Sequence, residues 1–522
     1  MKKYIMAIDD GTTGIRSILF DHDAKIKAQV YESIKQVFPL PNYTEQDAKE
    51  VWQKCQIVMK ESIKKAKIKP SQIEAIGVTT QRSTNLCWDK KTGRPVYNAI
   101  TWQDTRSADI CKQMDNKTKM KFVKGLGKTA RGLSKIFKGI RLTPTGARLT
   151  TAAGFSFTPV SSIAHTKWMF ENIESVKKLY DQGDLLCGTM DTWLIWNMTG
   201  KKVFATDYSN ASSTGMFDSF KLEWSDLFLD IFELPDDILP EIKETNDDFG
   251  NLDKKILGNE IPIRGCIADQ QSALFADGCF KAGDVKCTNG TGTFIDMNVG
   301  EKPPSSLHKL LPLIAWRMNK KTTYMLEGMI NTTGSTVQWL KENLGIIKDV
   351  EESERLAKKV EDTSGVYFVP AFTGLSSPYW DPHASGIVIG LSRKTTKEHI
   401  VRSALEGITY RCKDVINSMQ IDSNLQIRNM RADGGASKND FLLQFMADML
   451  DIKVERPKNL DSTALGAAFI AGIATEFWDS EKEILEKRSI DKIFKSKIKE
   501  ETRAELYKGW KRAIKRASMW RV

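Results

Sequence analysis

The pattern of apolar and polar positions in the first third of the chain predicts alternating strands and helices. Residues 30–36 and 73–79 are rich in apolar and β-branched residues and are typical of strands, whereas the spacing of apolar positions over 47–66 predicts a helix. Residues 185–198 predict a buried strand that runs directly into a helix. This order is typical of an α/β domain.

A second domain is predicted after a series of turn-forming residues. Asp and Gly cluster from Asp247 to Asn259, and a new strand is predicted at 261–268. We therefore expect an N-terminal lobe at 1–255 and a C-terminal lobe at 256–522. The predicted elements of the second lobe are helices at 335–344, 396–419 and 439–450, a strand at 366–370, a strand-to-helix loop at 433–437, and a helix at 464–475 capped by Asp461-Ser462-Thr463.

Two turns rich in glycine and threonine lie between apolar runs, one in each half of the chain. They are Asp9-Asp10-Gly11-Thr12-Thr13-Gly14-Ile15-Arg16 and Thr288-Asn289-Gly290-Thr291-Gly292-Thr293-Phe294. Glycine has no Cβ, so such a hairpin can bring backbone N–H groups close to an anion, and threonine hydroxyls add donors. Asp9 could hold Mg²⁺ through water. Two such hairpins indicate one nucleotide held between two similar lobes.

Composition narrows the class of protein. The chain has 522 residues, of which 41% are hydrophobic and 27% charged, and this is typical of a globular protein of two or more domains. No apolar run approaches the roughly 20 residues that span a bilayer, and the first residues lack a secretory signal, so we expect a cytoplasmic protein. The eight cysteines lack metal-ligand spacing, so we expect reduced, mostly buried thiols.

The net charge of +11 comes from one segment. Residues 116–170 contain eleven Lys or Arg and no Asp or Glu, so the rest of the chain balances at 66 charges of each sign. Within this segment, residues 117–142 form a basic insertion with apolar residues at helical spacing, namely Phe122, Leu126, Ala130, Leu133, Phe137 and Ile140. The inserted region as a whole is expected to extend from residue 117 to about residue 150.

The basic insertion allows three interpretations. Its apolar stripe could pack on its own domain with the lysines in solvent, which we favour because four glycines each weaken an isolated helix by about 1 kcal/mol. It could instead lie on an anionic membrane. Binding to nucleic acid is not expected, because no recognition module accompanies the charge.

Two further clusters have the chemistry of a small-alcohol site. A strand at 261–268 leads to Asp269 and Gln270, where a carboxylate can accept the proton of a substrate hydroxyl and the amide can bind a neighbouring one. An aspartate at that place could also be a helix N-cap. The second cluster combines Arg82 and Ser83 with the segment Trp102 to Arg106, a set of donors and an aromatic wall suited to a small hydroxylated substrate.

Ordered segments from Tyr4 to about Trp520 resemble the FGGY carbohydrate kinases, and among these the glycerol kinases most closely. They are Gln81-Arg82, Trp88 to Gly93, Tyr97 to Ile100, Asp191 to Leu194, Thr206 to Ser212, Pro370 to Leu375, Pro378 to Pro382, and Gly386 to Leu391 followed by His399-Ile400 and Ser403 to Glu406. The resemblance implies two actin-like, ribonuclease H-like lobes that close on ATP, with a cleft between them.

The resemblance also implies roles for individual residues. The nucleotide-binding positions are Thr12, Thr13, Gly14, Arg16, Thr291, Gly334, Gln338, Gly435 and Asn439. Asp269 matches the general base, Asp9 the carboxylate associated with Mg²⁺, and Arg82, Trp102, Gln270 and Phe294 the residues of the glycerol pocket. A homo-oligomer, either a dimer or a tetramer, is expected.

Two positions depart from the glycerol kinase pattern. Ser83 replaces a glutamate that grips substrate hydroxyls, and Val160 stands where a tyrosine is usual. Losing a hydrogen bond to a charged group costs about 1.5–3 kcal/mol, which corresponds to roughly ten- to a hundredfold in substrate discrimination. Asp104, in a Trp-x-Asp-x-Arg pattern, is a candidate substitute carboxylate.

The sequence therefore predicts an ATP-dependent kinase of a small polyol, with glycerol as the leading substrate. A kinase for another polyol or a ketose is the nearest alternative. An actin-like ATP-binding protein with a regulatory or membrane-associated role is a second one, although such a scaffold would not need a base at Asp269.

Overall fold

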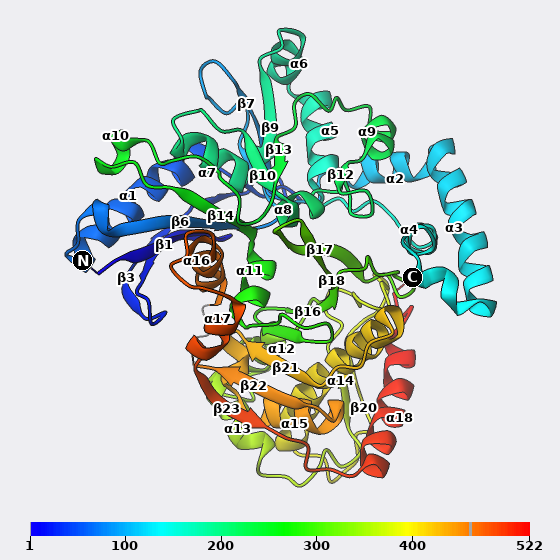
Figure 1. Ribbon diagram of the computed structural model, residues 1–522. Coiled ribbons are helices and arrows are strands. Elements are labelled where there is room, and N and C mark those ends of the chain that lie inside the picture. Colours follow the sequence, from blue (N-terminus) through cyan, green and yellow to red (C-terminus); the bar gives the residue numbers. More distant parts are fainter. Residues whose placement is uncertain (1, 459–461, 522) are drawn as a thin grey trace.

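Two separate β-sheets organise the molecule (Figure 1). The computed structural model describes residues 2–458 and 462–521. The first sheet has the order β14-β6-β1-β2-β3, and its strands are β1 (Tyr4–Asp10), β2 (Gly14–Phe20), β3 (Ile26–Ser33), β6 (Ile73–Thr80) and β14 (Ile263–Ala268). Strands β1, β2 and β3 are antiparallel neighbours, while β6 and β14 run parallel to β1.

The second sheet repeats this arrangement. Its order is β17-β18-β16-β15-β21-β22-β23, and its strands are β15 (Val285–Asn289), β16 (Thr293–Gly300), β17 (Leu311–Met318), β18 (Lys321–Ile330), β21 (Asn429–Asp433), β22 (Lys453–Pro457) and β23 (Ile490–Phe494). Again an antiparallel hairpin, β15–β16, adjoins a strand that runs parallel to its first member, here β21. The prediction of an α/β fold with two similar lobes is confirmed.

Helices and smaller sheets surround the two main sheets. The helices of the first part are α1 (Ala48–Ala66), α2 (Ala108–Asn116), α3 (Thr118–Ile136), α4 (Pro144–Ala152), α5 (Ser162–Asn172), α6 (Glu174–Asp181), α7 (Met190–Met198), α8 (Tyr208–Ser212), α9 (Asp226–Phe232), α10 (Lys254–Leu257) and α11 (Asp269–Ala276). Those that follow are α12 (Gly334–Glu342), α13 (Val350–Ala357), α14 (Lys397–Ser423), α15 (Asp440–Leu450), α16 (Ser462–Ala474), α17 (Glu481–Lys487) and α18 (Glu500–Ala517). Five short strands form a third sheet, β4 (Gln36–Val37), β5 (Glu45–Gln46), β8 (Ala99–Ile100), β7 (Asn85–Asp89) and β9 (Leu185–Thr189).

Most predicted elements lie within a few residues of the observed ones. Helix α1 begins after Asp47, whose carboxylate accepts the Lys49 N–H at 2.8 Å and so satisfies an end that has no intrahelical partner. Residues 185–198 form β9 and α7, as predicted. Strand β19 (Tyr367–Val369) falls at the predicted place. The predicted cap at Asp461 lies outside the described residues.

The first lobe extends further along the chain than expected. We predicted a boundary near residue 255, with the strand at 261–268 opening the second lobe. In the structure β14 instead pairs with β6 in the first sheet, and its register joins Ala268 to Thr80. Strand β14 follows the turns at 247–259 in the chain but still belongs to the first lobe. The chain therefore passes to the second sheet only between α11 and β15.

Helix α16 crosses back onto the first sheet, although it follows β22 of the second in the chain (Figure 1). The approach is close because two glycines meet the facing backbone. A Cβ on Gly77 of β6 would lie 2.1 Å from the Ala467 oxygen, and a Cβ on Gly466 would lie 1.9 Å from the Ser272 oxygen. A side chain at Gly77 would force α16 off the sheet, and one at Gly466 would force it away from α11.

All eight cysteines are buried free thiols, as predicted. Within residues 2–458 and 462–521, no helix is long and apolar enough to cross a bilayer.

The basic insertion is helical, but it does not pack by its apolar stripe. It forms α3 and the 3₁₀ helix η2 (Lys138–Leu142), and α3 buries the small residues Gly127, Ala130 and Ser134. A Cβ on Gly127 would lie 2.5 Å from the Ala153 nitrogen, at the end of α4. The favoured interpretation of self-packing is therefore wrong for most of the stripe, whose large residues stay exposed.

The close contact between α16 and β6 predicts a contrast between two glycines. Gly77→Ala should lower the free energy of unfolding by about 1–3 kcal/mol, because its methyl group would overlap the Ala467 carbonyl. Gly125→Ala on α3, where no atom lies within 4 Å of the new methyl, should raise it by up to about 1 kcal/mol. Urea unfolding of both variants measures the difference, and equal effects would contradict the packing argument.

Candidate active site

The first hairpin is a tight turn whose shape depends on glycine. The Gly11 N–H donates to the Gly14 oxygen at 2.9 Å and closes the turn between β1 and β2. The Tyr31 hydroxyl donates to the Thr13 oxygen at 3.0 Å, and a Cβ on Gly14 would lie 2.3 Å from that hydroxyl. The turn therefore holds its backbone in one conformation, with Thr13 exposed at its tip.

Side chains from other elements hold Thr12. The Trp102 indole N–H donates to the Thr12 hydroxyl at 2.9 Å, and the Gln46 amide donates to the Thr12 carbonyl at 2.7 Å. Trp102 is predicted in the substrate pocket and Thr12 at the nucleotide, so the structure brings members of the two predicted sets into contact.

Asp9 is the next-to-last residue of β1, beside the hairpin, and binds Arg16. Both Nε and a terminal nitrogen of Arg16 contact one oxygen of Asp9, at 2.8 and 2.7 Å. This pairing holds the Arg16 charge next to the turn. Among the described residues no group of three His, Cys, Asp or Glu side chains could hold a metal ion. Mg²⁺ usually takes one or two carboxylates and completes its shell with water and substrate phosphates, and Asp9 fits that requirement.

The neighbouring Asp10 is a buried carboxyl group that the sequence analysis did not single out. It is completely buried, and the Gln81 amide donates to one of its oxygens at 3.4 Å. Burial, opposed by the Gln81 hydrogen bond and reinforced by the charges of Asp9 and Asp269, raises the pKa of Asp10 to about 8. The group is therefore mainly protonated at neutral pH.

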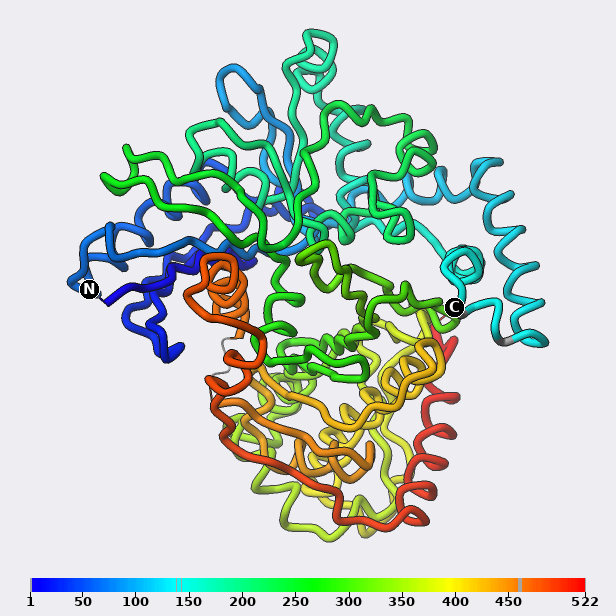
Figure 2. The backbone as a smooth tube through the Cα atoms, viewed as in Figure 1, coloured from blue at the N-terminus to red at the C-terminus, as the bar shows by residue number. Residues whose placement is uncertain are grey.

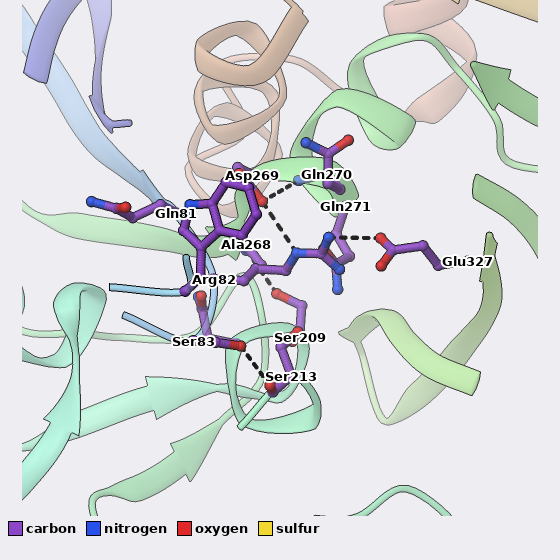
Figure 3. A network of polar contacts seen from close by, with 12 residues as sticks. Gln81, Arg82, Ser83, Ser209, Ser213, Ala268, Asp269, Gln270, Gln271 and Glu327 are labelled. Atoms are coloured by element: carbon purple, nitrogen blue, oxygen red, sulfur yellow. Dashed lines mark hydrogen bonds and ion pairs between the residues drawn. The ribbon is translucent and has the colours of Figure 1, made fainter. Parts of the chain in front are cut away.

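Arg82 lies between two carboxylates from different lobes (Figure 3). Its Nε is 3.3 Å from Asp269 at the start of α11, and a terminal nitrogen is 2.7 Å from Glu327 on β18. The guanidinium carbon is 6.0 Å from the centre of the Phe294 ring. Arg82 therefore contacts two other predicted site residues, Asp269 and Phe294, and adds Glu327 to them.

Asp269 combines partial exposure with an altered acidity. Its side chain is 29% exposed, whereas that of Glu327 is 3% exposed. Burial raises the pKa of Asp269, while the charge of Arg82 and the Gln270 N–H, which donates to it at 2.7 Å, lower it and only partly offset the increase. A carboxylate with a raised pKa that still reaches the surface is suited to accepting a proton.

A buried lysine holds the Gln270 side chain. Lys286 Nζ donates to the Gln270 amide oxygen at 2.9 Å and lies 3.3 Å from the Asp296 carboxylate. Burial alone would lower the pKa of Lys286, but Asp296 and two other aspartates outweigh it and raise the pKa. Burial raises the pKa of Asp296 to about 7 despite the lysine. Because Lys286 occupies its oxygen, Gln270 has its NH₂ group left to donate.

Neither Ser83 nor Asp104, the candidate substitute, supplies the carboxylate beside Arg82. The Ser83 hydroxyl donates to the Ser213 carbonyl at 2.7 Å, and Glu327 is the carboxylate beside Arg82 (Figure 3). Asp104 is completely buried, with its oxygens taken by Arg106 and by the Thr44 N–H at 2.6 Å. The structure thus gives no support to Asp104 as the substitute carboxylate, because its hydrogen-bonding capacity is already used within the fold.

The predicted nucleotide positions of the second half gather around the second hairpin. The Gly290 N–H donates to the Gly292 oxygen at 2.8 Å, and the N–H groups of Thr333 and Gly334 donate to Thr291 and Gly290 at 2.9 and 3.0 Å. A Cβ on Gly334 would lie 2.6 Å from the Gly290 oxygen, so α12 begins directly against the turn.

The remaining predicted nucleotide residues lie on segments that follow β21 or begin at this hairpin. Gly435 is exposed and opens a short 3₁₀ helix after β21, the strand that pairs with β15. Asn439 caps α15, accepting the Leu442 N–H at 3.0 Å and donating to Ser353 at 3.2 Å. Gln338 is exposed on α12 and donates to Glu342 at 3.0 Å.

Four residues of the site escaped the sequence analysis, namely Asp10, Lys286, Asp296 and Glu327. Each is a charged residue in a run that otherwise predicts a buried strand. That signal was available, because charged residues are almost never fully buried unless they are paired. The partners could not be named from sequence, since they lie on other strands.

Sequence models of one family cover most of the chain. The model of the FGGY family of carbohydrate kinases, N-terminal domain, matches residues 4–143 and 141–276, and that of the C-terminal domain matches residues 285–475.

Full-length relatives are similar to this chain. The glycerol kinase of Caldanaerobacter subterraneus subsp. tengcongensis is 46% identical over 100% of this chain and 99% of the relative, and glycerol kinase 2 of Thermotoga maritima is 43% identical over 99% of each. A crystal structure of Plasmodium falciparum glycerol kinase with ADP matches with a TM-score of 0.88 and 32% identity over 99% of this chain and 98% of that one. A xylulose kinase of Lactobacillus acidophilus, at 21% identity and a TM-score of 0.81 over 98% and 97%, shares the fold.

The raised pKa of Asp10 predicts a pH-dependent stability. In the unfolded chain Asp10 loses its proton above a pKa of 3.8, whereas in the folded protein it keeps the proton up to about pH 8. Asp10 therefore lowers the free energy of unfolding progressively as the pH rises from about 4 to about 8. Asp10→Asn removes this titration and should gain at least about 1 kcal/mol relative to the wild type between pH 5 and pH 8. Urea unfolding at both pH values, with the exposed Asp23→Asn as control, measures this gain, and a pH-independent difference would contradict it.

Proposed function

Because the chain belongs to the FGGY family of carbohydrate kinases, we propose that it transfers the terminal phosphoryl group of ATP to glycerol, forming sn-glycerol 3-phosphate and ADP. The observation that carries this proposal is the position of Asp269, a carboxylate with a raised pKa held by Arg82. Glycerol is the preferred acceptor because the relatives that match the whole chain are named glycerol kinases.

Asp269 acts as the general base of the proposed reaction. Its partly exposed carboxylate accepts the proton of the attacking hydroxyl as the bond to phosphorus forms, so that the oxygen attacks without a full positive charge. Arg82 limits the rise in the pKa of this carboxylate and keeps its ionised form accessible at neutral pH.

The pocket for the polyol consists of polar groups around an aromatic wall. Arg82 has N–H groups beyond those used by Asp269 and Glu327, and Gln270 presents the NH₂ group of an amide whose oxygen Lys286 already binds. Phe294 and Trp102 close the apolar side against the carbon chain of the substrate.

The two hairpins hold the phosphates of ATP. Thr12, Thr13, Gly14 and Arg16 offer donors and a positive charge on one side, and the Thr291 hydroxyl offers a donor on the other, beside Gly334. Gln338, Gly435 and Asn439 bind the rest of the nucleotide. Asp9 would hold Mg²⁺, which would supply positive charge to neutralise the phosphates of ATP.

A second candidate is a kinase for another polyol or a ketose. The observation in its favour is Ser83, whose hydroxyl is directed to the Ser213 carbonyl. Glu327 weakens this alternative, because it places a carboxylate beside Arg82 without residue 83. A third candidate, an ATP-binding scaffold, is disfavoured because it would not need a carboxylate with a raised pKa held by Arg82, as Asp269 is. We also propose, as the family resemblance implies, that the enzyme is a cytoplasmic homo-oligomer.

An ADP-release assay with glycerol, tetritols, pentitols and ketoses tests the proposed reaction. We expect glycerol to give the highest kcat/KM, and Asp269→Asn to lower kcat by at least about a hundredfold while nucleotide binding persists, because only the base is removed. Nucleotide affinity measured by calorimetry is the control. Preference for a five-carbon substrate would overturn glycerol, and substantial turnover of Asp269→Asn would refute the base.

The contact between Lys286 and Gln270 predicts a separate effect on substrate affinity. Lys286→Met should raise the KM for glycerol by about tenfold with a smaller change in kcat, because the Gln270 amide loses the donor that orients it. Steady-state kinetics measure the two constants.

The double variant Lys286→Met/Asp296→Leu is the matched control. It removes the buried carboxylate that the single variant leaves unpaired, and should therefore recover stability without recovering KM. If the double variant restores KM, the lysine acts only through the stability of the fold.

A further inference from the structure

The outer face of α3 exposes large apolar side chains that nothing in the described chain covers. Phe122, Leu126, Leu133 and Ile136 are 67%, 47%, 47% and 74% exposed, and Phe137 just beyond the helix is 62% exposed. The spacings of four, seven and three residues put the first four on one side of the helix. Figure 2 shows this helix at the outer edge of the molecule, so a flat partner could reach it.

A row of lysines runs beside this apolar face. Lys121, Lys128 and Lys135 recur every seven residues and are exposed. No ion pair involves them within residues 2–458 and 462–521. The lysines nearer the body are neutralised, since Lys117, Lys119 and Lys124 pair with Glu233, Asp230 and Asp115. The unpaired charges thus follow the exposed apolar face, with no acidic residue from 116 to 170.

Contacts along the inner side hold the helix to the rest of the protein. Gly127 and Ala130 are buried where α3 meets α4, and Arg141 in η2 donates to the Ile421 carbonyl of the second lobe at 2.9 Å. The exposed apolar face is therefore presented on an anchored element, with no need for the helix to detach from its own domain.

We propose that α3 and η2 dock the protein onto an anionic lipid surface, with Phe122, Leu126, Leu133 and Ile136 entering the headgroup region and the lysine row binding lipid phosphates. An amphipathic helix with a basic flank binds in the plane of such a surface. A second copy of this chain is a poorer partner, because a symmetric contact would bring the same unpaired lysines together. This goes beyond the proposed reaction and does not depend on it.

Co-sedimentation with vesicles tests the proposal. The full-length protein should pellet with phosphatidylcholine vesicles that contain about one third phosphatidylglycerol, and weakly with phosphatidylcholine alone, and the binding should fall as salt rises. Phe122→Ser/Leu126→Ser/Ile136→Ser and Lys121→Gln/Lys128→Gln/Lys135→Gln should each weaken binding by at least about tenfold, because they remove the apolar and the electrostatic contributions separately.

The matched control, Lys499→Gln/Lys508→Gln/Lys515→Gln, makes the same charge change on exposed residues at and along α18 and should bind like the wild type. Circular dichroism checks that each variant is folded. Failure of the wild type to pellet with anionic vesicles, or equal binding of all variants, would overturn the proposal. The proposal would also be overturned by the following pair of results. Anionic vesicles bind all forms equally, and the apolar variant loses a self-association that sedimentation velocity without lipid detects in the wild type.

Discussion

A buried guanidinium that must stay charged is the constraint on which the site depends. Arginine does not lose its proton in a protein, so Arg82 needs carboxylates around it once it leaves water. Asp269 comes from the start of α11 and Glu327 from β18, so the pairing joins the two lobes as well as balancing the charge. Removal of either carboxylate would leave the guanidinium with only one carboxylate partner.

The same requirement extends behind the pocket. Lys286 and Asp296 lie on the paired strands β15 and β16, directly below the second hairpin, and both are excluded from solvent. Their pairing makes a buried lysine tolerable, and the lysine in turn determines which end of the Gln270 amide faces outward. The pairing of Lys286 with Asp296 and the orientation of Gln270, a proposed substrate-binding residue, therefore both depend on the buried charge of Lys286.

Small residues attach the basic insertion to the protein by one face of α3 and leave the large apolar residues on the other face. Gly127 and Ala130 permit α3 to approach its neighbours closely, so large side chains are not needed to attach it. Phe122 and Ile136 are consequently left on the outside. The hydrophobic pattern of the segment correctly predicted an amphipathic helix, but pattern alone cannot say which of two faces meets the protein.

The sequence by itself determined what depends on local chemistry. The glycine hairpins at Gly11 to Gly14 and Gly290 to Gly292, the Asp47 cap and the strand leading to Asp269 all follow from residue type and spacing, because their contacts join residues close in the chain. The tertiary structure decided what depends on distant partners. The membership of β14 in the first sheet, the pairing of Glu327 with Arg82 and the burial of Asp104 each bring together residues more than fifty positions apart, and no local pattern specifies such pairs.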